Sequence, residues 1–165
     1  MDVAAATQPS ASQPSHARRR WMAVLARASA REIAALIERH AVLPGYTKLR
    51  GPEAGLVMVR GRTGGGGAPF NLGEITVTRC TVRTEGGQVG HAYVAGRDAG
   101  RAELAARVDA GLQDSSLREA LRREVIEPLA AAQEAARQDT ARRAAATRVQ
   151  FFTMATMRAD DRAST

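Results

Sequence analysis

The chain has 165 residues, of which 44% are hydrophobic and 25% charged, and this is enough for one globular domain with its own core. A single cysteine, Cys80, excludes an internal disulfide framework and a cysteine-based zinc site. No segment approaches the roughly 20 apolar residues of a membrane helix, and residues 1–15 lack the pattern of a secretory signal. We therefore expect a soluble cytoplasmic protein with a disordered polar tail over residues 1–15.

The net charge of +7 is concentrated in the first part of the chain. Residues 16–44 hold six basic against two acidic side chains and residues 45–97 seven against three, whereas residues 98–165 are balanced at eleven each. A basic segment favours an anionic partner, such as nucleic acid, a phosphorylated metabolite or an acidic protein surface. A solvated basic face explains the charge equally well.

Two helices are predicted before residue 45. The first covers residues 16–28, where apolar side chains recur at helical spacing. Ser29 and Glu32 then form the pattern of a capping box, which predicts the start of a second helix. That helix is expected to end near Pro44 and Gly45.

Residues 46–97 change to short β-rich runs separated by Gly, Pro and Asn. Short connections between successive runs favour an antiparallel meander. Alternation along the second run places Arg60 and Arg62 on one face. The predicted fold class is α+β, a four-stranded antiparallel meander flanked by N-terminal and C-terminal helices. The strands are expected near residues 46–51, 55–62, 73–84 and 88–96, with a turn over Gly51–Gly55 and a tight connection at Glu85-Gly86-Gly87.

The last third of the chain is predicted to be helical. Asp98 is a good N-cap for a helix over the apolar positions of residues 104–112. Asp114 begins a further helix, whose apolar line Pro128 is expected to kink or interrupt. Residues 130–148 have high helix propensity but few large apolar side chains, so we expect them to add little to the core.

Apolar and aromatic residues gather near the C-terminus, where a tail is usually polar. They are Val149, Phe151, Phe152, Met154 and Met157. They can dock on the chain's own core, or they can anchor a partner chain, because interface cores favour aromatic residues and methionine. Residues 155–165 are expected to form a polar tail.

The segment Arg60-Gly61-Arg62-Thr63 runs into four consecutive glycines, whose backbone N–H groups can form an anion-binding nest. A flexible loop between strands explains the same run. Neither a Walker A motif nor a G-x-G-x-x-G motif is complete here. Arg79 lies in the middle of a predicted strand, where burial would require a partner. The candidate residues for contact with an anion or a partner are Arg60, Arg62, Gly64, Gly65, Gly67, Arg79 and Arg97.

No catalytic set can be assembled from residue spacing. The three histidines are scattered, with no metal-ligand spacing between them. The sequence lacks a G-x-S-x-G elbow, and a lone cysteine is more often a small core residue than a nucleophile. We therefore expect no catalytic residue and no metal site in this chain.

Several segments, taken in order, match one known family over roughly residues 20–154, which we expect to form a single domain over residues 16–154. They are Trp21-Met22-Ala23-Val24-Leu25-Ala26, Glu53-x-Gly55-Leu56-Val57 running into Arg62 and Gly64-Gly65-x-Gly67, Thr76-x-Thr78-Arg79, Val94-x-Gly96-Arg97-Asp98 and Val149-x-Phe151-Phe152-Thr153-Met154. With this ordered set the chain resembles the PhnG subunits of the bacterial carbon-phosphorus lyase system. The family commonly continues the last segment into Arg-Gly, whereas Ala155-Thr156 follows here.

The resemblance implies a subunit of a transferase that joins methylphosphonate to the ribose C1′ of ATP and releases adenine. It implies PhnI as the closest partner, PhnH and PhnJ in the same core complex, and PhnL and PhnK as further partners. ATP is then a substrate of the complex, and the iron-sulfur cluster and S-adenosylmethionine belong to PhnJ. This chain is expected to bind no cofactor, nucleic acid or membrane. Phe151, Phe152 and Met154 are the expected partner-binding residues.

Two other classes of function stay open from the residues alone. A small basic nucleic-acid-binding module fits the charge, although aromatic residues are only 4% of the chain and no stacking platform is evident. A free-standing enzyme acting on a phosphorylated metabolite is the other. A nucleic-acid binder loses affinity steeply with salt, whereas a free-standing enzyme turns over substrate without partners.

Overall fold

The structure is a computed structural model, and it describes residues 16–40, 43–62 and 67–148. The chain divides into two units, residues 1–131 and residues 132–165, and each is described by itself. The predicted boundaries of a single domain over residues 16–154 stay a prediction.

The first two helices start and stop close to the predicted positions. Helix α1 covers His16–Leu25 and helix α2 covers Ala30–His40. The capping box is confirmed, because the Ser29 N–H and hydroxyl donate to the Glu32 carboxylate at 2.8 and 2.7 Å, and the Glu32 N–H donates to Ser29 Oγ at 3.2 Å. These bonds lower the pKa of Glu32 and satisfy N–H groups that the first helical turn leaves free.

The sheet has three antiparallel strands, in the order β1 (Tyr46–Arg62), β2 (Pro69–Thr84) and β3 (Val89–Ala95). The α+β class and the antiparallel meander are confirmed, but the prediction of four strands is wrong. The two runs expected on either side of residues 51–55 are one strand, β1. The connection between β2 and β3 lies at Glu85-Gly86-Gly87 as predicted, and Gly87 takes a φ of +85° there.

The turn predicted over Gly51–Gly55 is wrong, because these residues belong to β1, and the register between β1 and β2 shifts between Arg50 and Glu53. A bulge accommodates extra residues without ending the strand. Pro52 is tolerated because β1 is an edge strand, and a proline at a bulge on an edge removes no required ladder hydrogen bond. Proline and glycine therefore marked an irregularity within one strand.

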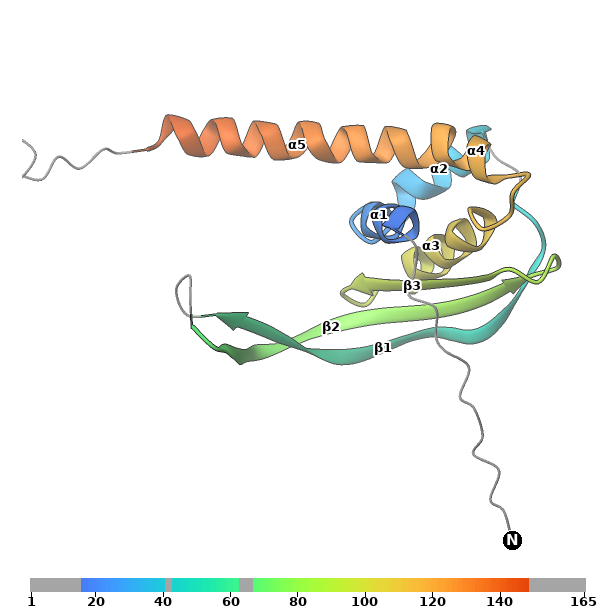
Figure 1. The fold of residues 1–165 in the computed structure, drawn as a ribbon, viewed down its shortest axis with the longest axis horizontal. Coiled ribbons are helices and arrows are strands. Elements are labelled where there is room, and N and C mark those ends of the chain that lie inside the picture. Colours follow the sequence, from blue (N-terminus) through green and yellow to red (C-terminus); the bar gives the residue numbers. More distant parts are fainter. Residues whose placement is uncertain (1–15, 41–42, 63–66, 149–165) are drawn as a thin grey trace, which may run out of the picture. The chain divides into compact units, whose positions relative to one another are not determined.

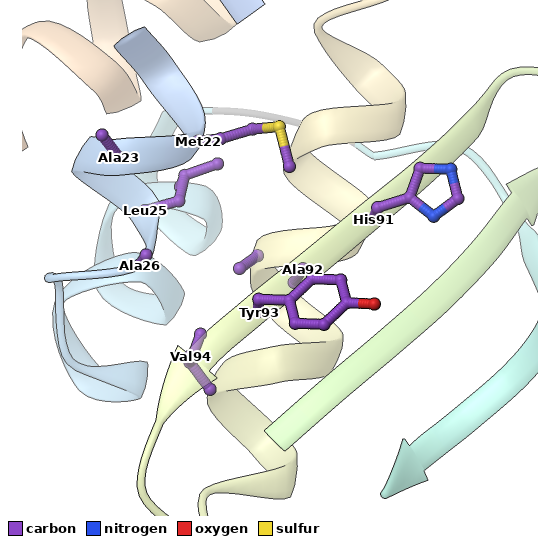
Figure 2. Close-up of a pocket in the computed structure, with 9 residues that line it drawn as sticks. Met22, Ala23, Leu25, Ala26, His91, Ala92, Tyr93 and Val94 are labelled. Carbon is purple, nitrogen blue, oxygen red and sulfur yellow. The ribbon is translucent and has the colours of Figure 1, made fainter. Parts of the chain in front are cut away.

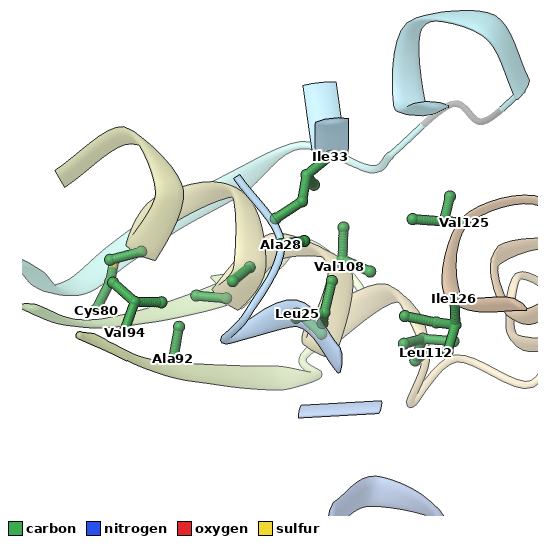
Figure 3. Packing of buried hydrophobic residues seen from close by; sticks show 14 of the residues in the cluster. Leu25, Ala28, Ile33, Cys80, Ala92, Val94, Val108, Leu112, Val125 and Ile126 are labelled. Atoms are coloured by element: carbon green, nitrogen blue, oxygen red, sulfur yellow. The ribbon is translucent and has the colours of Figure 1, made fainter. Parts of the chain in front are cut away.

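One face of the sheet is covered by helix α3 (Ala99–Gly111), against which α1 and α2 pack (Figure 1). Alternate residues of β2 and β3 point into this core, while the opposite face is open to solvent. Figure 3 shows buried side chains from the sheet meeting those from the helices. The largest buried apolar side chains are Leu25, Ile33, Leu112, Leu121, Val82, Val94, Val108 and Val125. Burial of each contributes about 1.5–3 kcal/mol.

The predicted N-cap of α3 is confirmed, because the Asp98 carboxylate accepts from the Arg101 N–H at 2.9 Å. Helix α4 (Arg118–Leu121) then runs into a π-helical turn, η1 (Arg122–Ile126), and helix α5 (Glu127–Ala146). Pro128 cannot donate a backbone hydrogen bond and its ring crowds the preceding turn. The predicted interruption takes the form of this wider turn, where the Glu127 N–H bonds to the Arg122 carbonyl.

In the second unit, residues 132–146 belong to α5 and form a mostly exposed helix. Side chains four residues apart form ion pairs on its surface, such as Arg143 with Asp139 at 2.9 Å. Few large apolar residues occur here, in agreement with the prediction that this segment adds little core. Within the described ranges, no helix combines the length and the apolar character needed to cross a membrane.

Candidate functional site

The most unusual feature of the fold is a two-stranded extension of the sheet. Strand β3 ends at Ala95, which pairs with Val77, whereas β1 and β2 continue past this point (Figure 1). We call residues 56–62 of β1 and 69–76 of β2 the β1–β2 ribbon. An isolated two-stranded hairpin is at best marginally stable in water. The rest of this chain therefore adds little to the stability of the ribbon.

The ribbon exposes large apolar side chains on both faces. Six of the eight exposed large hydrophobic side chains among the described residues lie on it, with Leu56 64% and Leu72 61% exposed. The register places Leu56 and Met58 on one face and Val57 and its partner Ile75 on the other. Exposed apolar surface gathered in one place marks an interaction site. The six are Leu56, Val57, Met58, Phe70, Leu72 and Ile75.

The two predicted arginines of β1 lie at the end of this ribbon. Arg60 pairs with Asn71 and Arg62 with Pro69, both arginines are exposed, and the regular register between them keeps them on one face as predicted. Of the predicted glycines, Gly67 lies just before β2 and is partly buried. Gly64 and Gly65 lie outside the described residues, as do Phe151, Phe152 and Met154, so their roles stay predictions.

Arg79 lies on β2 and forms an ion pair with an acidic side chain of β1. Its Nε donates to Glu53 Oε1 at 2.8 Å, and Arg50 also pairs with this carboxylate. Desolvation acts to raise the pKa of Glu53, but the hydrogen bond from Arg79 and the two positive charges outweigh it, and the pKa is lowered. The side chain of Arg79 is 39% exposed, so it is a half-exposed, neutralised cation on the open face of the sheet.

The structure separates the predicted arginines from one another. Arg79 pairs with Glu53, and Arg60 lies seven positions further along β1, roughly 23 Å away at the rise of an extended strand. Arg97 is exposed at the junction of β3 and α3, beside the N-cap Asp98. These residues do not form one anion pocket within the described part of the chain.

A buried carboxylate that sequence reasoning missed links three elements. Asp109 of α3 is fully buried and accepts from Arg18 at 2.7 and 3.1 Å and from Trp21 Nε1 at 2.8 Å. It also accepts from the His91 backbone N–H at 2.9 Å and from Gln113 Nε2 at 3.5 Å. In the sequence, two signals point to this cluster: Asp109 is an acidic residue within an apolar helix, and Arg18 lies three residues before Trp21. The cluster fixes α1 and β3 onto α3.

A second polar cluster joins β1 to α3. Glu103 accepts from Tyr46 and pairs with Lys48 at 2.8 Å, while the Arg107 guanidinium lies 4.5 Å from the centre of the Tyr46 ring. The hydrogen bonds from Lys48 and Tyr46 lower the pKa of Glu103. Cys80 is buried beneath this cluster, and desolvation raises the pKa of its thiol. Cys80 is therefore a core residue, as predicted.

A pocket of about 240 Å³ lies between α1 and β3. Figure 2 shows Met22 and Leu25 of α1 on one side, and His91, Tyr93 and Val94 of β3 on the other. No carboxylate, lysine or arginine lines it, so it suits an apolar side chain better than a triphosphate. Nor do the described residues contain a group of three or more His, Cys, Asp or Glu side chains placed to hold a metal ion.

Fold and site together define a small α+β protein with an extensive apolar contact surface and no catalytic constellation among its described residues. The chain belongs to the PhnG family: the family model described as phosphonate metabolism protein PhnG matches residues 16–157. It is 46% identical over 137 residues to the alpha-D-ribose 1-methylphosphonate 5-triphosphate synthase subunit PhnG of Rhizobium meliloti (strain 1021). This match covers 83% of the chain and 87% of the relative. The family resemblance is thereby confirmed.

Proposed function

We propose that this chain is a partner-binding subunit of a synthase that makes α-D-ribose 1-methylphosphonate 5-triphosphate, and that the catalytic groups belong to its partners. The reaction breaks the bond between the ribose C1′ and the adenine of ATP and forms a bond from C1′ to a phosphonate oxygen. The family match and the name of the Rhizobium relative support the reaction. The apolar β1–β2 ribbon supports the role of this chain within it.

The exposed ribbon is the single observation on which the binding role rests. Full burial of a Leu, Ile, Val, Phe or Met side chain contributes about 1.5–3 kcal/mol, and six such side chains are exposed on this one extension. Association has its own entropic cost, so buried area does not convert directly into affinity. Because both faces of the ribbon are apolar, we expect it to insert between surfaces of the partner.

The partners we propose are PhnI as the closest contact, with PhnH and PhnJ in the same assembly and PhnL and PhnK as further members. ATP enters as a substrate of the assembly. The iron-sulfur cluster and S-adenosylmethionine belong to PhnJ under this proposal, and the present chain binds neither. The scattered histidines and the buried Cys80 are consistent with that division of labour.

Arg60 and Arg62 have a role of their own in this proposal. They lie beyond Leu56 and Met58 on β1, past a register shift between Val59 and Arg60, and are exposed, and arginine forks suit carboxylate and phosphate oxygens. We propose that they contact an acidic group of the partner or the triphosphate of ATP. An Arg62→Glu variant that assembles normally but requires more ATP favours the triphosphate, whereas a loss of assembly favours the partner.

An omission experiment tests the proposed function. PhnI, PhnH and PhnL from the same organism are incubated with ATP and methylphosphonate, with and without this chain, and the ribose methylphosphonate product is measured by phosphorus NMR beside free adenine. We expect this product only when this chain is present, and none from this chain by itself. Equal formation of the product with and without the chain would contradict the proposal.

A further inference from the structure

Strand β3 is an edge of the sheet, and its outward-facing backbone groups can be identified from its pairing with β2. The Gly96 N–H donates to the Thr76 carbonyl and the Thr84 N–H donates to the Gln88 carbonyl. In an antiparallel pair such bonds occur at every second residue. Even-numbered residues of β3 therefore bond to β2, and residues 89, 91, 93 and 95 direct their N–H and C=O groups away from the sheet.

Side chains already occupy this edge at both ends. The Val89 carbonyl accepts from Arg18 at 3.1 Å and from Gln113 at 2.7 Å, and the His91 N–H donates to Asp109. At the other end, Arg101 donates to the Ala95 carbonyl. A protein that covers part of an edge strand leaves the remainder available for pairing.

Four backbone groups between these ends have no hydrogen-bond partner among the described residues. They are the His91 carbonyl, the N–H and carbonyl of Tyr93, and the Ala95 N–H. They form one complete unit of an antiparallel ladder, because a residue opposite Tyr93 would exchange two hydrogen bonds with it. The edge is thus open for a short strand centred on Tyr93.

The apolar pocket lies beside this open stretch. His91, Ala92, Tyr93 and Val94 contribute to its wall from β3 (Figure 2). Ala92 and Val94 face the helices, so residues of an added strand opposite them would also face the helices, toward Met22 and Leu25. The pocket and the unpaired backbone therefore suit one extended peptide with an apolar side chain at this position.

The positive charge near Ala95, at one end of the open stretch, indicates which type of side chain would flank the apolar residue of the incoming peptide. Arg97 follows β3, is exposed, and makes no ion pair among the described residues. Arg101, which covers the Ala95 carbonyl, lies nearby on α3. An acidic side chain of the incoming segment would be attracted to this end and would fix its direction and register.

We propose that the open edge of β3 binds an extended segment of a partner subunit, which adds a fourth strand to the sheet and places an apolar side chain in the pocket and an acidic one beside Arg97. This is β-strand addition, in which main-chain bonds provide affinity and side-chain pockets provide specificity. The proposal rests on the proposed function only for the identity of the donor, a subunit of the same assembly.

A Tyr93→Pro variant tests the proposal on the whole assembly. Proline removes the Tyr93 N–H, which makes no bond to β2, so the sheet itself loses no hydrogen bond. The matched control is Tyr93→Thr, which removes the exposed ring but keeps the N–H. Each full-length variant is co-expressed with PhnI, PhnH and PhnJ, and its association is measured. In the unaltered chain, hydrogen exchange of the Tyr93 and Ala95 amides is compared between the isolated chain and the assembly.

We expect these two amides to exchange at least about tenfold more slowly in the assembly than in the isolated chain. We expect Tyr93→Pro to weaken association by at least about tenfold, as loss of one well-formed backbone bond implies, and Tyr93→Thr to associate normally. Unchanged exchange, together with normal association of Tyr93→Pro, would overturn strand addition while the proposed function stands. Failure of the unaltered chain to assemble would instead overturn the proposed function and its donor.

Two further outcomes would assign the edge to a different occupant and overturn the proposal. If the two amides are already protected in the isolated monomer, a segment of this chain covers the edge. If the isolated chain is a dimer by light scattering and Tyr93→Pro makes it monomeric, a second copy covers it.

Discussion

Among individual residues, Asp109 has the strongest effect expected on stability. It is a fully buried carboxylate that accepts from Arg18, Trp21 and the His91 backbone. Replacing this carboxylate removes the acceptor of the Trp21 Nε1–H and of the His91 N–H together with the ion-pair partner of Arg18, which is 22% exposed, and we expect this to cost about 3–5 kcal/mol. That loss is a large part of the 5–15 kcal/mol by which a typical domain is stable.

We therefore expect Asp109→Ala to lower the free energy of unfolding by about 3–5 kcal/mol, measured by urea denaturation. Asp109→Asn keeps an acceptor for Trp21 and should lose less. Glu134→Gln is the matched control, because its ion pair with Arg137 is exposed and should contribute little to stability. Equal losses in Asp109→Ala and Glu134→Gln would contradict the assigned network.

Glu103 should affect the pH dependence of stability, because hydrogen bonds from Lys48 and Tyr46 lower its pKa in the folded chain. A group with a depressed folded pKa contributes stability above its unfolded pKa, here near 4.5, and that contribution is lost as the pH falls through the folded pKa. Unfolding measured from pH 6 to pH 3 should show a shallower acid loss in Glu103→Gln than in the unaltered chain. Parallel pH profiles would contradict the assignment.

At the scale of elements, the close contact of β3 with α3 depends on Gly90. A Cβ built on Gly90 would lie 2.0 Å from the Ala106 carbonyl oxygen and 2.6 Å from the Ala110 nitrogen. Backbone atoms cannot move as a flexible side chain can, so helix and strand must separate. We expect Gly90→Ala to destabilise the fold by about 1–3 kcal/mol, as overpacked cores do. Measurement is by thermal unfolding.

Gly55→Ala provides the control for this prediction, since no atom of the described residues lies within 4 Å of a Cβ at Gly55. It should leave the melting temperature nearly unchanged. A Gly90→Ala variant as stable as Gly55→Ala would show that α3 does not pack on β3 in the described manner.

Much of this arrangement could be predicted from the sequence, because local patterns determine it. The capping box of Ser29 and Glu32 and the N-cap Asp98 are satisfied within one turn of helix, and such bonds depend only on nearby residues. The merging of two predicted strands at Gly51 and Pro52 depends instead on the partner strand, which decides whether a bulge or a turn forms.

The candidate site could be predicted only in part. Arg60 and Arg62 do share a ribbon face, as period-two alternation requires. The separation of Arg79 from them, the ion pair with Glu53 and the burial of Asp109 all depend on contacts between residues far apart in the chain. Spacing along a sequence carries no signal for such contacts.

The molecule as a whole leaves two surfaces exposed, the apolar side chains of the β1–β2 ribbon and the unpaired backbone groups of β3. Large apolar patches on a separate protein promote association. We expect the isolated chain to self-associate and to bind a hydrophobic dye, and we expect both effects to diminish when it is co-expressed with its partners. Dye fluorescence that is equally low in the isolated chain would indicate that the ribbon is already covered.

We propose that the β1–β2 ribbon attaches this chain to the other Phn subunits. The most direct measurement is size exclusion of the assembly formed on co-expression with PhnI, PhnH and PhnJ, comparing the unaltered chain with a Leu56→Asp/Ile75→Asp variant and an Ala120→Asp control on α4. We expect one stoichiometric assembly for the unaltered chain and for the control, whereas the double variant should elute free of the other subunits. Equal assembly of the double variant, or no assembly by the unaltered chain, would contradict it.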